Sequence, residues 1–307
     1  MKRVHVIIPV LCLLLPASLA FAGGSKDRIA ADAGKTATKP KIAVSILPHA
    51  YFVRRIGGEL ISTLVLVGPG QDPHSYEPSP RQMEELSSAK AWLLSGTDFE
   101  IAFKPKIASI FPALTMVDGT DGVEFRSMEA HGHEGEEHEE GEVHGMEIDR
   151  HTWLGRKPAK IFADHVFKTL SAVAPENTAI FEANHQSLIA DIDREFDALI
   201  PILSPLKGKP VFVFHPAFGY FLDEFGIVQE AVETGGKEPT AKALAALIEE
   251  AKADDAKVIF VQSQFPVNAA KTVANAVGAT VAPLDPLAED WLANIKVMGE
   301  ALKKASR

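Results

Sequence analysis

Short runs of apolar residues alternate along this chain with amphipathic segments, and the alternation predicts strands and helices in turn. The expected strands are 41–47, 60–67, 91–95 and 114–118 in the first half, and 210–214, 227–232, 258–261 and 280–282 in the second. Strands that alternate with helices form parallel sheets covered on both faces. We therefore predict an α/β fold with two similar lobes, each a four-stranded parallel sheet flanked by helices.

One longer periodic segment separates the two series. Between Glu176 and Leu203 the apolar residues recur at intervals of three, four or seven, which places them on one face of a single helix. These residues are Phe181, Leu188, Ile192, Phe196, Leu199 and Leu203. At 1.5 Å per residue the helix would be roughly 40 Å long, about the height of a small domain. We predict one long rigid helix that joins the lobes.

The two series also resemble each other in sequence. Glu77–Leu86 and Glu238–Leu247 both begin with Glu-Pro and continue with a hydroxyl residue that can cap a helix. Both segments lie between the second predicted strand of their series and the next helix. This shared location favours duplication over a chance match. Two similar lobes that face each other would bring their strand ends to one cleft.

The start of the chain has the pattern of an export signal. A basic start, an apolar run and the small-residue site at 20–22 predict a secretory signal peptide at 1–22. The other predicted segments are a flexible leader at 23–40, an N-terminal lobe at 41–174, a linking helix at 175–206 and a C-terminal lobe at 207–307. The apolar run is too short for a permanent anchor, and the only cysteine, Cys12, lies inside it. We expect an exported protein of the bacterial periplasm, soluble after cleavage and without disulfides.

Charge changes the picture in two ways. The chain has 307 residues and a formal net charge of −10, and its acidic, aromatic-poor composition argues against nucleic acid as a partner. A loop at 127–150 concentrates Glu, Gly and histidine, and its histidines are His131, His133, His138 and His144. Such a solvated loop binds transition metals weakly. Because His133 and His138 are five residues apart, they do not form the helical His-Glu-x-x-His motif of zinc proteases.

Histidine also appears where strands end. His215 follows the buried strand at 210–214, and ligands of parallel sheets bind beyond the carboxyl ends of strands. Alone it would be read as a core residue, but His74, His151 and Asp285 lie in similar positions, so that each lobe supplies two such side chains. Three neutral imidazoles and one carboxylate suit a tetrahedral Zn²⁺ site, whereas Mn²⁺ would prefer more oxygen ligands.

Four motifs carry a resemblance to a known family. They are Asp-Pro-His-Ser-Tyr-Glu-Pro-Ser at 72–79, His-x-Trp-Leu at 151–154, His-x-x-x-Gly-Tyr-Phe at 215–221 and Leu-Asp-Pro-Leu at 284–287. In this order they resemble the periplasmic zinc receptors, or solute-binding proteins, of ABC importers, over essentially residues 41–304. The resemblance implies two lobes joined by a rigid helix, high-affinity Zn²⁺ capture between them, and delivery to a membrane permease driven by a cytoplasmic ATPase.

The resemblance also sets the alternatives within the family. Manganese and iron receptors of the same family resemble this chain too, but they usually carry a glutamate at the position of His215, and an acidic histidine-rich loop is typical of the zinc members. Zinc receptors often have a disulfide in the second lobe, which this chain cannot form. Some use a glutamate beside the first histidine as a ligand. Here that neighbour is Pro73, so the fourth position falls to Asp285 or to water.

Two other classes of function remain open from the sequence. A zinc-dependent hydrolase would also use three histidines and an exchangeable position. It would need a general base, and the nearest candidate by sequence, Glu77, is better placed to orient an imidazole from behind. A surface adhesin with a structural zinc would share the fold. We expect a monomeric receptor that is not an enzyme.

Overall fold

The structure is a computed structural model that describes residues 39–128, 148–233, 240–264 and 268–305. The predicted signal peptide, most of the predicted leader and the histidines of the predicted loop, His131, His133, His138 and His144, lie outside the described residues. Within the described part of the chain, no helix is both long enough and apolar enough to cross a membrane.

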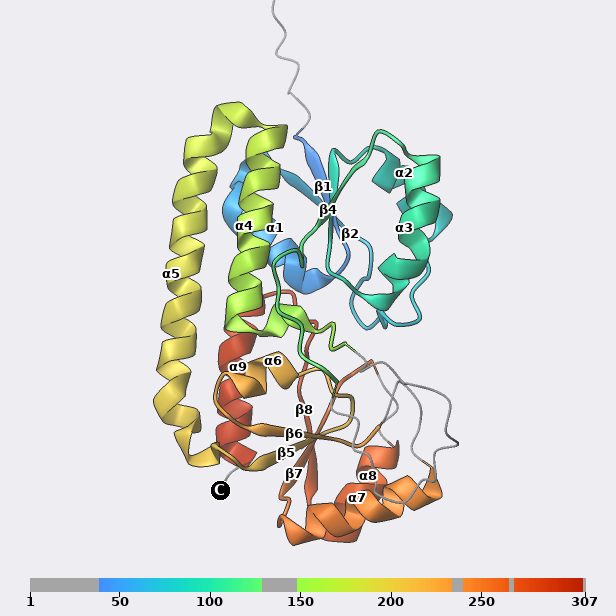
Figure 1. Ribbon diagram of the computed structural model, residues 1–307, viewed down its shortest axis with the longest axis vertical. Helices are drawn as coiled ribbons and strands as arrows, with labels where there is room; N and C mark the ends of the chain where they lie inside the picture. Colours follow the sequence, from blue (N-terminus) through green and yellow to red (C-terminus); the bar gives the residue numbers. More distant parts are fainter. Residues whose placement is uncertain (1–38, 129–147, 234–239, 265–267, 306–307) are drawn as a thin grey trace, which may run out of the picture. The chain divides into compact units, whose positions relative to one another are not determined.

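The first half of the chain forms a four-stranded parallel sheet with the order β2-β1-β3-β4 (Figure 1). Its strands are β1 (Lys41–Val44), β2 (Ser62–Val65), β3 (Ala91–Leu94) and β4 (Thr115–Asp118). Its helices are α1 (Leu47–Gly57), α2 (Pro80–Ser87), α3 (Asp98–Ile110) and α4 (Arg156–Val173), with short 3-10 turns at Gly58–Leu60 (η1), Thr152–Leu154 (η2) and Pro175–Asn177 (η3). Figure 1 shows α1 and α4 on one side of this sheet and α2 and α3 on the other.

The second half repeats this plan with the order β6-β5-β7-β8, again all parallel. Its strands are β5 (Pro210–Val213), β6 (Val228–Ala231), β7 (Val258–Val261) and β8 (Thr280–Pro283). Its helices are α6 (Gly219–Asp223), α7 (Ala241–Ala253), α8 (Asn268–Val277) and α9 (Trp291–Ala305), after a 3-10 turn at Ser204–Leu206 (η4). The shared strand order supports an origin by duplication.

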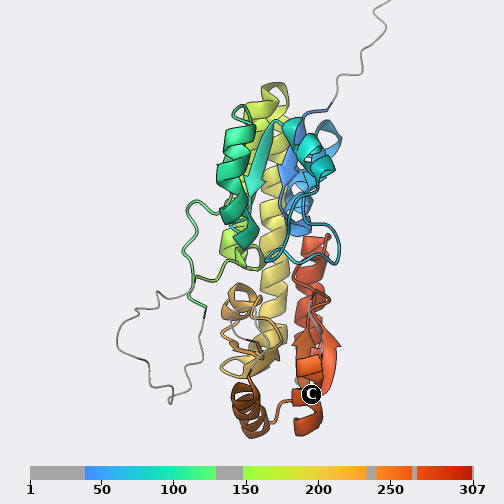
Figure 2. The ribbon, with the colours of Figure 1, turned by 90° about the vertical axis from the view of Figure 1, so that its right-hand side faces the viewer.

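A single long helix, α5 (Thr178–Leu203), lies between the two halves in sequence and beside both in space (Figures 1 and 2). Its buried residues are the six predicted from the spacing: Phe181, Leu188, Ile192, Phe196, Leu199 and Leu203. It packs against α1 and α4 of the first lobe and α9 of the second. The approach to α9 is close, because a Cβ on Gly299 would lie 2.4 Å from a methyl carbon of Leu199. The predicted fold class is confirmed.

The strands are shorter than the sequence predicts, for local reasons. Helix α1 begins at Leu47, with a proline in its first turn, and so ends the extended segment early. Helix α2 begins after Ser79, where the Ser79 hydroxyl accepts from the Gln82 backbone and the Gln82 side chain accepts from the Ser79 backbone. Such a capping box explains the Ser-Pro start that the sequence shows. The equivalent helix α7 follows Thr240.

Helix α1 buries one histidine, His49, against aromatic side chains. His49 is 2 % exposed, and its ring stacks on Phe162 with the centroids 3.6 Å apart. Burial lowers the pKa of His49 to about 3. In the unfolded chain the pKa returns to near 6.5, so the unfolded state binds a proton between these values and the folded state does not. Stability that is fully present above pH 6.5 is therefore lost as the pH falls toward 3.

We expect His49→Phe to flatten this acid dependence in the metal-free protein. Phenylalanine keeps the stacked ring but binds no proton. Between pH 6.5 and 4, the free energy of unfolding of the wild type should fall more steeply than that of the variant, by about 1.4 kcal/mol per pH unit. Denaturant titrations at pH 7, 5.5 and 4.5 measure both slopes. Equal slopes would show that His49 does not stay neutral in the folded state.

Candidate metal centre

Three histidines reach one point from loops at the carboxyl ends of strands. His74 follows β2 in a loop held by Asp72, whose carboxylate accepts from the His74 backbone N–H at 2.9 Å and from the Ser75 hydroxyl at 2.9 Å. These bonds fix the loop locally, in the manner of an Asx turn. The position of the His74 backbone is thus set by its own segment.

His151 precedes the turn η2, and that turn is fastened to the second lobe by two indoles. The Trp153 indole N–H donates to the carbonyl of Pro286 at 2.8 Å, and the Trp291 indole N–H donates to the carbonyl of Trp153 at 2.7 Å. Both bonds are buried, and buried polar groups are costly to leave unpaired. The His-x-Trp-Leu motif therefore combines a possible ligand with an anchor between lobes.

His215 stands two residues beyond the end of β5. Its backbone N–H donates to the side-chain oxygen of Gln262 at 3.2 Å, and the Gln262 amide donates to the His215 carbonyl at 2.7 Å. Gln262 directly follows β7, the neighbouring strand. The side-chain amide of Gln262 thus continues the backbone pairing past the end of the sheet. It pairs with both the backbone N–H and the backbone carbonyl of His215.

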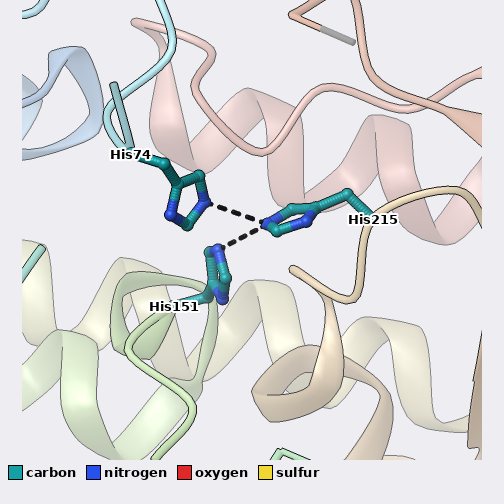
Figure 3. A group of neighbouring side chains, drawn as sticks. All are labelled: His74, His151 and His215. Carbon is teal, nitrogen blue, oxygen red and sulfur yellow. Dashed lines mark hydrogen bonds between the residues drawn. The ribbon is translucent and has the colours of Figure 1, made fainter. Parts of the chain in front are cut away.

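The three imidazoles converge through their Nε2 atoms (Figure 3). The Nε2 atom of His215 lies 3.1 Å from that of His74 and 3.1 Å from that of His151. All three ligand atoms lie within 4.8 Å of one another. Zinc–nitrogen bonds of 2.0–2.1 Å in a tetrahedron would separate two nitrogens by about 3.3 Å, so this spacing suits a bound ion.

A carboxylate holds the far side of each ring. The Nδ1 atom of His74 lies 2.7 Å from Asp98. That of His151 lies 2.9 Å from Asp149, and that of His215 lies 2.5 Å from Glu233. An Nδ1–H that donates to a carboxylate leaves Nε2 as an unprotonated acceptor, which is the tautomer a metal requires. These contacts also place negative charge around the centre.

Sequence reasoning missed these three carboxylates. Asp98 begins α3 after β3, and Glu233 follows β6 by two residues, so both lie where strands end. The rule that located the histidines would have located these two acids as well. Asp149 could have been found only from its distance of two residues to His151. Glu77, predicted to orient an imidazole, is exposed and is not one of the three.

The imidazoles differ in how readily they take up a proton. Burial lowers the pKa of His215 to about 4, against the opposing effect of Glu233. For His74, burial is outweighed by the hydrogen bond to Asp98 and by the charges of Asp72 and Asp98, and its pKa is raised. His215 is therefore neutral and ready to bind a metal at neutral pH. As the pH falls, protons compete with a metal at His74 before they do so at His215.

Asp285 lies near the centre but outside the cluster. Among the described residues, the group of ligand atoms within 4.8 Å of one another consists of His74, His151 and His215. One carboxylate oxygen of Asp285 instead accepts from the Leu287 backbone N–H at 2.9 Å. Asp285 lines a neighbouring pocket, which shares Gln264 with the pocket of the histidines.

Comparison with known proteins places this arrangement in a family. Residues 42–305 match the family described as "Zinc-uptake complex component A periplasmic". The "Zinc-binding lipoprotein AdcA" of Streptococcus pneumoniae is 26 % identical over 299 residues, which cover 94 % of this chain and 56 % of that protein. The chain thus spans about half the length of that relative.

Solved structures give the same result. The crystal structure of ZnuA has 34 % sequence identity and a TM-score of 0.79, and covers 87 % of this chain and 99 % of that one. A deletion mutant of ZnuA with zinc bound has 34 % identity and a TM-score of 0.78, with 87 % and 97 % covered. The fold is therefore shared along nearly the whole of those chains.

Proposed function

Because this chain belongs to the family of periplasmic components of zinc-uptake complexes, we propose that it captures Zn²⁺ with high affinity and delivers it to the permease of an ABC importer. The observation that carries the proposal is the set of three converging imidazoles, each backed by a carboxylate. Three neutral nitrogen donors favour zinc over manganese, which prefers oxygen. Zinc is here the cargo of the protein.

The proposed ligands are His74, His151 and His215. Asp285 or a water molecule completes the tetrahedron. For Asp285 to do so, its carboxylate would have to move toward the three Nε2 atoms, because among the described residues it lies outside their cluster. Asp98, Asp149 and Glu233 take the orienting role that the sequence assigned to Glu77. The proposal includes export by the peptide at 1–22, residence in the periplasm as a monomer, and contact with the ATPase only through the permease.

A zinc hydrolase is less well supported by this geometry. The three carboxylates in contact with the imidazoles all lie on the Nδ1 side of the rings, away from the point where the Nε2 atoms converge. Each is already engaged by an N–H donor. A general base must reach the proton of a metal-bound water. We therefore infer a receptor and not an enzyme.

A competition experiment tests the proposed function. The chain from residue 23 onward is refolded with equal, excess concentrations of Zn²⁺, Mn²⁺, Fe²⁺ and Co²⁺, and the retained metal is measured after gel filtration. We expect one tightly held zinc ion per chain, which a strong chelator removes without unfolding the protein. Retention of manganese or iron would favour the other receptors of the family. Unfolding on chelation would favour a structural zinc.

The predicted loop at 127–150 is expected to gather zinc without forming the transport site. Ordering a flexible chain around an ion costs roughly 1 to 2 kcal/mol per residue fixed. Deletion of residues 129–147 should therefore leave one tight site and abolish additional weak binding. Calorimetric titration of the full and shortened proteins compares the two. Loss of the tight site with the fold retained would mean that the loop supplies a primary ligand.

A further inference from the structure

The carboxylate that orients His151 is itself held by an arginine. One oxygen of Asp149 accepts from the backbone N–H of His151 and faces its ring Nδ1, each at 2.9 Å. The other oxygen accepts from Nη1 of Arg126 at 2.9 Å. The Asp149 side chain is fully buried, and that of Arg126 is 13 % exposed. Arg126 therefore determines which oxygen remains for His151.

The same guanidinium also contacts the second lobe. Its Nε donates to Asp223 in α6 at 2.8 Å. The Arg126 backbone N–H donates to the hydroxyl of Tyr220 at 3.1 Å, and that hydroxyl donates to the Asp149 carbonyl at 2.9 Å. The bond to Asp223 is charge-assisted, and bonds of this kind are among the stronger polar contacts. Arg126 and Asp149 thus form one unit with α6.

Gly219 explains how the guanidinium fits there. A Cβ at this position would lie 1.9 Å from Nη1 and 2.4 Å from Cζ of Arg126, and 2.9 Å from an oxygen of Asp149. These distances are far below any normal contact. Only glycine leaves room for the ion pair. The Gly-Tyr pair of the motif at 215–221 therefore serves His151 of the other lobe as well as its own segment.

We propose that Arg126 is a positioning residue for metal binding, which, seated against Gly219 and Tyr220, holds Asp149 in the orientation that fixes His151. The inference rests on the proposed function, because it concerns the hold on the same ion. As a consequence, the contact between the two lobes and the affinity for the metal depend on each other. A movement that separates α6 from Arg126 also loosens the carboxylate behind His151, and so weakens the grip on the metal.

Substitutions at the two ends of this contact test the proposal. We expect Arg126→Ala to weaken zinc binding by about 10-fold, mainly through faster dissociation, as for other changes to groups that orient ligands. Gly219→Ala should have a similar effect, because the methyl group displaces the guanidinium. In the double variant the guanidinium is already gone and only the Asp149 oxygen, 2.9 Å from the added Cβ, remains close, so the affinity should fall far less than the two single effects combined would predict. Arg126→Lys should restore part of the loss.

Arg156 supplies the matched control. It also joins two lobes, through Asp193 and Asp197 of α5 and Glu224 after α6, but it does not contact Asp149. Arg156→Ala should change the stability of the metal-free protein and leave the zinc dissociation rate within about twofold of the wild type.

Stopped-flow release of zinc to a chelator, with denaturant titration of each metal-free variant, provides both readouts. Dissociation rates of Arg126→Ala and Gly219→Ala equal to that of the wild type would overturn the proposal, as would additive effects in the double variant. If Arg126→Ala does not fold, Arg126→Lys and Gly219→Ala decide in the same way. A wild type that holds no zinc, or a tight site unaffected by His215→Ala, would instead refute the proposed function.

Discussion

Replacing His215 by alanine is expected to produce the largest loss of zinc affinity of any single change in this protein. Its Nε2 atom is the one within 3.1 Å of both other imidazoles. Its ring is 3 % exposed and kept neutral by burial, which lowers its pKa to about 4. The variant loses a nitrogen ligand and leaves Glu233 buried without that partner. We expect a loss greater than the roughly 10- to 100-fold typical of changes behind a ligand.

His185 offers a matched control for this experiment. It lies on α5, where its ring pairs with Asp164 and stacks on Phe167, and it is not part of the metal cluster. His185→Ala removes the same number of atoms and should leave zinc affinity unchanged. Competition with a zinc chelator of known affinity measures both variants. An unchanged affinity in His215→Ala would remove His215 from the site.

Zinc affinity should also fall steeply as the solution is acidified. Zinc binds the neutral imidazole, so every proton taken up by a free ligand competes with it. The pKa of His74 is raised by Asp98 and Asp72, so competition begins above the usual histidine pKa of 6.5. Each pH unit below the pKa of one ligand costs about tenfold. The affinity at pH 5.5 should therefore be at least about 10-fold weaker than at pH 7.5.

Asp98→Asn tests the assigned cause of this dependence. The amide can still accept from Nδ1 of His74 but carries no charge, so the pKa of His74 should fall. The decline in affinity should then begin at a lower pH than in the wild type. Calorimetric titrations between pH 5 and 8 give both curves. An affinity independent of pH between 5 and 7.5 would contradict a histidine site.

The fold could be predicted from the sequence because the buried residues of helices and strands recur at regular intervals along the chain. The six apolar residues of α5 face α1, α4 and α9, and their spacing alone identified them. Strand ends were more difficult, because a turn or a capped helix can begin inside an apolar run. Leu60, predicted to be the first residue of the second strand, lies in the turn η1.

The site could be predicted only in part, because strand ends give position but not side-chain direction. The three histidines point to one centre, whereas Asp285, placed by the same rule, accepts from the backbone of its own loop. Asp98 and Glu233 also follow strands, but in a sequence with 41 Asp and Glu residues nothing local distinguishes them from surface acids. Arg126 and Asp223 are 97 positions apart in the sequence, so the pattern of residues around either one does not predict their contact.

Anomalous diffraction at the zinc edge, from crystals of the chain loaded with one equivalent of zinc, tests the central claim most directly. The proposed site predicts a single strong peak, about 2.0 to 2.1 Å from the Nε2 atoms of His74, His151 and His215. The density in the fourth position identifies the remaining ligand as water or Asp285. A peak elsewhere in the protein, or one in contact with fewer than three of these imidazoles, would contradict the account.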